Sequence, residues 1–343
     1  MPRVKAPRTD RCFAFLVLVV VPLAGCGGSQ NSLAPESHQA RDIANLFWWM
    51  MGGAWVGLGL VVALLLWSWK RRNRRGFGRD VEGEKPGEKH SWYAVVGLGI
   101  VMPIIVISTL FVVSDLFVIK TTQAPASTTT RLTIEVTGHR WWWEVRYPGT
   151  SAVTANEIHI PVRTPVRIEV RTADVIHSFW VPELNRKIDT IPGRTNVIEL
   201  DAEATGRYRG QCAEFCGLQH AHMAMYVFVE EPSAFRRWLA REERPAANAA
   251  SGEADEGERL FMDGPCSSCH TIRGTEADGY VGPDLTHLAS RTTLGAVTIT
   301  NNRENLREWI VDSQHIKPGN QMPNFDISGP KLDALVTYLE GLR

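Results

Sequence analysis

The segment "QCAEFCGLQHAHM", residues 211–223, holds two cysteines, two histidines and a methionine within thirteen positions. Thiolate, thioether and imidazole groups are ligands that suit copper, and a His and Cys site with a weak axial Met is the mononuclear blue-copper arrangement. That arrangement uses one cysteine, whereas this segment has two. The role of the second cysteine therefore has to be sought in the fold around the segment.

Short strands surround the segment. Apolar residues alternate with period two in "RLTIEVTG", "EIHIPV", "PVRIEVRT", "TNVIEL" and "MAMYVFVE", and Pro, Gly and Asp separate these runs. Several such strands in succession are typical of a β-sandwich or barrel. Read as strand, loop and strand, the segment places four candidate metal ligands at one end of this fold: Cys212, Cys216, His220 and Met223.

A loop this short seldom closes a coordination sphere, so one more histidine is expected from elsewhere. His177, in "TADVIHSFWVPEL", is the best candidate because it lies between two strand patterns. A mononuclear site of His177, Cys216, His220 and Met223 leaves Cys212 without a role. Two bridging thiolates instead hold two copper ions, each capped by one histidine, with the electron shared between the metals.

Two alternatives to copper remain for the cysteine pair, a disulfide and a structural zinc site. Zinc rarely recruits methionine and prefers closed tetrahedral Cys and His sets, so copper is favoured. Three further histidines are predicted to be bystanders: His139, His159 and His222.

A second motif, "CSSCH", matches the attachment signature of c-type haem. Cys266 and Cys269 would bond to the porphyrin and His270 would bind the iron; a zinc or redox C-x-x-C site is the alternative. Met322, in "QMPNF", is the predicted sixth ligand, and methionine there raises the reduction potential. His287 and His315 are the rival ligands.

The N-terminal part predicts a membrane protein. Residues 1–25 read as a signal peptide whose ending "LAGC" resembles a bacterial lipoprotein signal, which makes Cys26 a lipid-bearing N-terminus; the alternative is an uncleaved anchor. Residues 43–69 and 92–119 are apolar stretches long enough to be membrane helices. The loop between them begins with "KRRNRR", so it faces the cytoplasm and the chain after residue 120 lies outside the bacterial inner membrane.

Composition and patterning divide the rest of the chain. The formal net charge of the 343 residues is zero, which gives no indication of nucleic-acid binding. We expect a transmembrane hairpin over 26–120, a β-sandwich or barrel copper domain over 121–240, a polar linker over 241–256, and an all-α unit without convincing strands over 257–343. A tethered haem unit would keep an electron donor at high local concentration near the copper.

Three motifs together, "VIHSFWVPEL", "KIDTIPG" and "QCAEFCGLQHAHM", closely resemble subunit II of cytochrome c oxidase over residues 40–240. The resemblance implies a cupredoxin-like domain with a binuclear copper centre, CuA, at which electrons enter. It also implies the copper ligands, which are the side chains of His177, Cys212, Cys216, His220 and Met223 and the backbone carbonyl of Glu214. The Glu214 carboxylate is expected to reach a magnesium ion at the contact with subunit I, a hard cation that suits it.

Two more stretches resemble family motifs. In "GHRWWWEV", strand alternation predicts Trp141 and Trp143 on one face and Trp142 on the other, and the family implies electron entry here, with Trp141 the leading candidate. Relatives usually have Gln where this chain has Arg140. "GPDL" resembles the loop of class I cytochromes c whose proline carbonyl, here that of Pro283, accepts a hydrogen bond from the haem histidine.

The whole chain resembles the caa3 type of subunit II, in which a class I cytochrome c domain is fused at the C-terminus. This implies an electron-entry subunit that passes electrons from cytochrome c and its own haem c to CuA, and on to subunit I, where oxygen is reduced to water and protons are pumped. Implied partners are subunit I, other oxidase subunits, a soluble or membrane-bound cytochrome c or a quinol–cytochrome c reductase, and membrane lipid. The alternatives are a nitric oxide or nitrous oxide reductase component and a non-catalytic copper-binding assembly protein.

Overall fold

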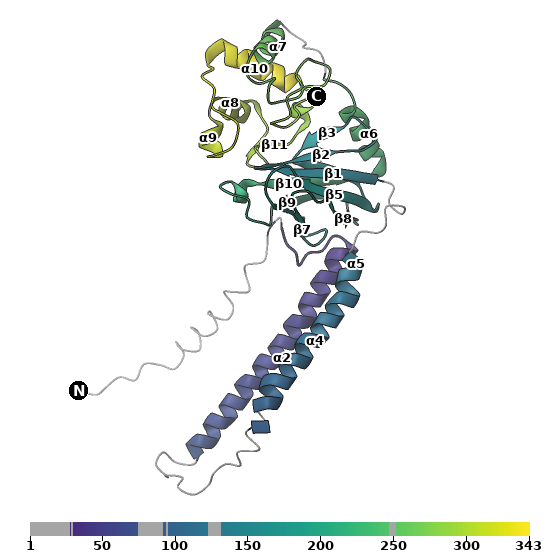
Figure 1. The fold of residues 1–343 in the computed structure, drawn as a ribbon, viewed down its shortest axis with the longest axis vertical. Helices are drawn as coiled ribbons and strands as arrows, with labels where there is room; N and C mark the ends of the chain where they lie inside the picture. Colours follow the sequence, from purple (N-terminus) through teal and green to yellow (C-terminus); the bar gives the residue numbers. More distant parts are fainter. Residues whose placement is uncertain (1–27, 29, 75–91, 94, 123–131, 247–251) are drawn as a thin grey trace, which may run out of the picture.

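The computed structural model of the protein describes residues 28, 30–74, 92–93, 95–122, 132–246 and 252–343. Three parts follow one another along the longest axis: a helical hairpin, a β-sandwich and a mostly helical domain at the end far from the hairpin (Figure 1). The predicted signal peptide 1–25 and Cys26 lie outside the described residues, as do 75–91 of the predicted cytoplasmic loop.

In the part of the chain that the structure describes, two helices are long and apolar enough to cross a membrane, spanning His38–Arg71 and Gly97–Ser114 with mean hydropathies of 2.0 and 2.4. The first belongs to α2 (His38–Arg74). The second runs through the π-helical segment Gly97–Val101 and α4 (Met102–Ser114), and continues as Asp115–Ile119 and α5 (Lys120–Thr122). Both predicted helices are therefore present, and α2 extends beyond the predicted 43–69 at both ends.

The early start of α2 has a local cause in Ser37. Its Oγ accepts a hydrogen bond from the backbone N–H of Ala40 at 3.0 Å, the bond that an N-cap side chain makes. The same hydroxyl donates to the Leu184 carbonyl, and the neighbouring Glu36 pairs its backbone with Glu183 and Glu203 of the sandwich. The hairpin is thus joined to the sandwich by hydrogen bonds that the apolar pattern does not reveal.

The sandwich is built from ten strands, β1 (Leu132–His139), β2 (Trp142–Arg146), β3 (Val153–Ala155), β4 (Glu157–Pro161), β5 (Val166–Thr172), β6 (His177–Phe179), β7 (Ile188–Thr190), β8 (Asn196–Leu200), β9 (Gly206–Gln211) and β10 (Ala224–Glu230). One sheet has the order β3-β2-β1-β5-β8, a second has β4-β10-β9, and β6 pairs with β7. The β1–β5 and β4–β10 pairs are parallel and the other pairs are antiparallel.

The core of the sandwich comes from the alternation seen in the sequence. In β1 and β5 every second residue is buried, including Ile134, Val136, Ile168 and Val170, each 0 % exposed. Helix α6 (Pro232–Glu242) covers one end with Phe235 and Trp238. The sandwich carries the loop between β9 and β10.

The C-terminal domain contains α7 (Gly252–Asp263), α8 (Arg303–Val311), α9 (Ser313–Ile316) and α10 (Gly329–Gly341), with short 3₁₀ turn Leu288–Ser290. It also contains β11 (Thr293–Leu294) and β12 (Ile299–Thr300), which pair with each other, so the expectation of no strands is wrong in this detail. Two-residue strands are too short to show a period-two pattern.

The predicted linker 241–256 is also shorter in the structure. Helix α6 runs to Glu242, and α7 begins at Gly252. Ala254, Gly257 and Phe261 form the buried stripe of α7, and two of these residues are too small to give an apolar signal in the sequence.

Candidate copper centre and haem site

The two thiols of the copper segment lie side by side between β9 and β10. Cys212 Sγ is 3.8 Å from Cys216 Sγ, far beyond the roughly 2.05 Å of a disulfide, and both cysteines are free and buried. Backbone hydrogen bonds hold Cys212 in place. The Cys212 N–H donates to the Met223 carbonyl at 2.9 Å, and the N–H of the next residue, Ala213, donates to the Ser178 carbonyl. In this geometry the two sulfur atoms are not joined by a disulfide.

Each sulfur has one imidazole and one weaker donor beside it. His177 Nδ1 lies 3.9 Å and the Glu214 carbonyl oxygen 3.3 Å from Cys212 Sγ. On the other side, His220 Nδ1 lies 3.5 Å and Met223 Sδ 3.8 Å from Cys216 Sγ. His177, Cys212 and Cys216 also form a group whose ligand atoms lie within 4.8 Å of one another. Two matched sets of sulfur and nitrogen donors fit a pair of copper ions.

Local backbone geometry brings the second half of this donor set together. Gly217 has a backbone φ of +113°, which residues other than glycine rarely adopt. The turn at Gly217 leads into the 3₁₀ helix His220–His222. The His220 N–H donates to the Gly217 carbonyl at 3.1 Å. As a result His220 and Met223 face Cys216, whereas His222 is exposed.

Asp174 orients His177, a contact that the sequence reasoning missed. Its Oδ1 accepts from His177 Nε2 at 2.8 Å, which leaves Nδ1 facing Cys212. Burial of the Asp174 carboxyl is outweighed by hydrogen bonds from His177 and from two backbone N–H groups, and its pKa falls to about 2. The only sequence signal was the position of an aspartate three residues before a candidate ligand.

Ionisation of the paired thiols is coupled. A hydrogen bond from Cys216 lowers the pKa of Cys212 below its usual range, in spite of burial. The same contact, together with burial, raises the pKa of Cys216. One thiolate therefore forms readily while the second deprotonation needs a compensating positive charge, which a metal ion supplies.

The three tryptophans occupy three different environments. Trp141 lies in the turn before β2, not in the strand as alternation predicted, and its Nε1 donates to the Cys216 carbonyl at 2.9 Å. Trp143 is fully buried and its ring meets His177 edge-on, with centroids 5.9 Å apart. Trp142 points elsewhere and stacks on His139 at 4.3 Å. Trp141 and Trp143 thus both contact residues of the copper site.

The "CSSCH" motif forms a turn after α7, with the N–H groups of Cys269 and His270 both donating to the Cys266 carbonyl. The His270 ring nitrogen Nδ1 donates to the Pro283 carbonyl at 2.8 Å. Burial lowers the pKa of His270, which favours the neutral imidazole that binds a metal. Gly282 lies against this ring, since a Cβ there would be 2.4 Å from His270 Cε1. The donor set therefore fits a covalently attached haem.

Met322 lies in the loop between α9 and α10. Ser313 and Gln314 both donate to its carbonyl at 2.8 Å, and its N–H donates to Asn320 Oδ1 at 2.7 Å. Of the rival iron ligands, His287 donates Nε2 to the Arg244 carbonyl at 3.0 Å and His315 is exposed.

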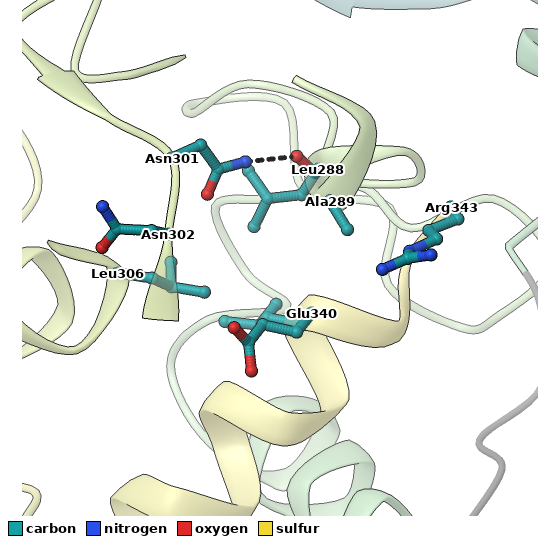
Figure 2. A pocket seen from close by; sticks show the side chains of 8 residues that line it. Leu288, Ala289, Asn301, Asn302, Leu306, Glu340 and Arg343 are labelled. Atoms are coloured by element: carbon teal, nitrogen blue, oxygen red, sulfur yellow. Dashed lines mark hydrogen bonds between the residues drawn. The ribbon is translucent and has the colours of Figure 1, made fainter. Parts of the chain in front are cut away.

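The described part of the chain also contains a pocket of about 190 Å³ near the C-terminus (Figure 2). Its lining consists of Leu288, Ala289, Asn301, Asn302, Leu306, Leu339, Glu340 and Arg343. Asn301 Nδ2 donates to the Leu288 carbonyl at 2.8 Å across this pocket. None of the candidate copper or haem residues lines it.

Comparison with known proteins places this geometry in a family. Residues 150–230 match the model of the cytochrome c oxidase subunit II periplasmic domain, and residues 254–343 match the cytochrome c model. Cytochrome c oxidase subunit 2 of Alkalihalophilus pseudofirmus is 31 % identical over 98 % of both chains. The chain belongs to the cytochrome c oxidase subunit II family. Subunit 2 of Bacillus sp. PS3 is 27 % identical over 97 % of both chains.

Two solved structures are also similar. The periplasmic domain of subunit II from Bradyrhizobium japonicum is 34 % identical and covers 35 % of this chain and 96 % of its own, with a TM-score of 0.33. A heme-copper terminal oxidase dimer contains a chain 21 % identical, which covers 41 % of this chain and 99 % of its own, with a TM-score of 0.32.

This member of the subunit II family is of the caa3 type, because a cytochrome c domain follows the copper domain in one chain. The two domains imply CuA and haem c as cofactors, and the Cys and His group of the sandwich fits the copper. The predicted fold class is confirmed: two apolar helices, a cupredoxin-like β domain and a helical cytochrome c domain.

Proposed function

We propose that this chain is the electron-entry subunit of a caa3-type haem–copper oxidase. It receives electrons at its cytochrome c domain and delivers them through CuA to subunit I, where oxygen is reduced to water with proton pumping. The observation that supports this most strongly is the double donor set around two free thiols 3.8 Å apart, in a chain that also carries a cytochrome c domain. When bound, copper and haem supply one-electron redox chemistry.

The chain's own residues hold these groups. His177, Cys212, Cys216, His220, Met223 and the Glu214 carbonyl are the copper donors, and Asp174 fixes the orientation of His177. Cys266 and Cys269 attach the haem, and His270 and Met322 bind its iron, with Pro283 orienting His270. Trp141 is the electron-entry residue, and its indole N–H donates to the Cys216 carbonyl.

Further assignments concern the complex and the membrane. The Glu214 carboxylate is half exposed with Lys187 Nζ 4.0 Å away, and we assign it to a magnesium ion at the contact with subunit I. The sandwich and haem domain lie on the extracytoplasmic side of the inner membrane, where a cytochrome c or a quinol–cytochrome c reductase reaches them. Cys26 is the lipid-bearing residue.

The copper assignment is tested by metal analysis and electron paramagnetic resonance of the purified full-length chain. Wild type should bind two copper ions per chain with a mixed-valence spectrum, and Cys212→Ser or Cys216→Ser should abolish that spectrum because a serine oxygen does not bridge two copper ions as thiolate does. His222→Ala, an exposed neighbour, is the control and should keep both. One copper per chain in wild type would favour the assembly-protein alternative. The reductase alternative is tested by measuring whether the complex consumes oxygen or nitric or nitrous oxide. Consumption of oxygen would exclude the reductase alternative.

The iron ligand is tested by Met322→Ala. This variant should keep its haem attached through both cysteines, but it should lower the haem potential and open the iron to exogenous ligands because the thioether is lost. Redox titration and carbon monoxide binding measure both effects, with Met262→Ala in α7 as the control. A wild-type spectrum in the Met322 variant would transfer the role to His287 or His315.

A further inference from the structure

Lys317 is a buried lysine between the two soluble domains. It follows α9, is 3 % exposed, and forms no ion pair with a carboxylate of the described residues. Its Nζ donates instead to three backbone carbonyls, each at 2.8 Å. One of them, that of Gly295, belongs to the haem domain, and the other two belong to the copper domain, at Trp141 and His222. Three acceptors match the three N–H donors of an ammonium group.

The two copper-domain carbonyls belong to residues next to the candidate metal site. Trp141 is the residue whose indole donates to the Cys216 carbonyl, and His222 directly precedes Met223. The turn that carries Lys317 makes two more contacts with the same loop. Gln219 donates its side-chain amide to the Pro318 carbonyl, and Leu218 lies against Gly319, where a Cβ would be 2.5 Å from Leu218 Cδ2. The haem domain therefore contacts Trp141 and the loop 217–222.

The same turn continues into the loop of Met322. Asn320 donates its side-chain amide to the Lys317 carbonyl at 2.9 Å and accepts from the Met322 N–H at 2.7 Å. A continuous set of hydrogen bonds thus joins the Trp141 carbonyl, Lys317, Asn320 and Met322. A second contact, away from the copper, holds the same pair of domains: Glu157 Oε1 of β4 accepts from the N–H and the hydroxyl of Thr292, at 2.7 and 2.6 Å.

We propose that Lys317 is a positioning residue for electron transfer within this chain, which fixes the loop of Met322 against the Trp141–Cys216 contact. This rests on the proposed function, because it requires haem near Met322 and copper at Cys216. In the step itself one electron leaves the ferrous haem and enters the copper pair, with no bond made or broken. The buried charge favours one arrangement of the domains, because a small relative shift would leave the still-buried ammonium without two of its acceptors before water could replace them.

The test uses the purified oxidase complex with Lys317→Met. This substitution keeps a side chain of similar length but removes the three N–H donors of the ammonium group. Lys331→Met, an exposed lysine of α10, is the control. Flash photoreduction of haem c should show transfer to copper slowed severalfold in Lys317→Met, because loss of the three hydrogen bonds lets the Met322 loop move away from the Trp141–Cys216 contact and lengthens the path between the two centres. Copper content, haem content and the spectra of both centres should stay as in wild type.

A second readout does not depend on turnover. Hydrogen–deuterium exchange of the full-length chain should increase in residues 217–223 and 313–320 of Lys317→Met and stay unchanged in Lys331→Met. If Lys317→Met does not fold, Glu157→Ala loosens the same interface from a distant contact and should slow the transfer in the same direction. A wild-type transfer rate in a folded Lys317→Met complex overturns the proposal. Absence of a copper pair or haem in wild type would instead overturn the proposed function.

Discussion

At the scale of single residues, Asp174 shows how a side chain outside the donor set prepares it. The carboxylate accepts from His177 Nε2, so the other ring nitrogen is the one presented to Cys212. Asp174→Asn removes the charge that favours this tautomer, and we expect copper affinity to fall about 10- to 100-fold, as for other residues that orient metal ligands. Competition with a copper chelator measures the loss.

Asp189→Asn, on the neighbouring strand β7, is the matched control and should bind copper as wild type does. Equal affinities of the Asp174 and Asp189 variants would mean that burial alone orients His177. Trp143 and Gly138 pack against the His177 ring. The experiment therefore separates the effect of this packing on the ring orientation from that of the Asp174 hydrogen bond.

The residues that the sequence revealed are those with a distinctive chemical type at a fixed spacing. Cys212, Cys216, His220 and Met223 lie within one loop, so their proximity followed from the chain itself. Asp174 and Lys317 were missed because an aspartate or lysine in a polar loop has many ordinary roles, and only the fold shows which atoms they reach.

At the scale of elements, the contact between α7 and α10 depends on a residue without a side chain. A Cβ at Gly257 would lie 2.0 Å from the Ala334 carbonyl oxygen and 2.7 Å from Tyr338 Cβ. Gly257→Ala therefore forces the helices apart and should destabilise the haem domain by about 1–3 kcal/mol, the usual effect of overpacking. Thermal unfolding of the full-length chain, followed by the haem absorption, measures this.

Gly252→Ala at the start of the same helix is the control, since nothing lies within 4 Å of a Cβ there. It should be neutral or slightly stabilising, because alanine has the higher helix propensity. If both variants unfold at the same temperature, α10 moves away without loss of packing and the close approach contributes little.

Element types were more predictable than element ends. Alternating apolar residues located β1, β4, β5, β8 and β10 because the apolar side chains of each strand lie in the core; in β1 and β5 one face is buried, whereas β4 is buried on both faces. The starts of α2 and α7 were not located because they depend on Ser37 and on a stripe of small residues, neither of which contributes to an apolar pattern.

At the scale of the whole molecule, the arrangement of the two soluble domains could not be read from the sequence. The resemblance identified both domains, but their contact is made by backbone carbonyls, which every residue has, and by loops far apart in the chain. The predicted polar linker left the two domains free to take many orientations, whereas the structure shows Arg273, Thr292 and Lys317 bonded to the copper domain.

The character of that contact leads to a prediction about ionic strength. Among the described residues, no ion pair joins the sandwich and the haem domain, and Lys317 and Glu157 are buried. Residues 252–343 nevertheless contain fourteen acidic and eight basic side chains, so the domain presents a net negative charge to an external donor. At about 0.1 M salt, interactions between exposed charges more than about 10 Å apart are largely screened, whereas buried hydrogen bonds are little affected.

Raising the salt concentration should therefore slow reduction of haem c by a basic soluble donor, because long-range attraction is screened. Transfer from haem c to copper in the same complex should change by less than about twofold, since the tethered domain needs no encounter step. Stopped-flow mixing measures the first rate and flash photoreduction the second. An intramolecular rate that falls together with the bimolecular one would mean that the haem domain leaves the copper domain in solution and returns by charge attraction.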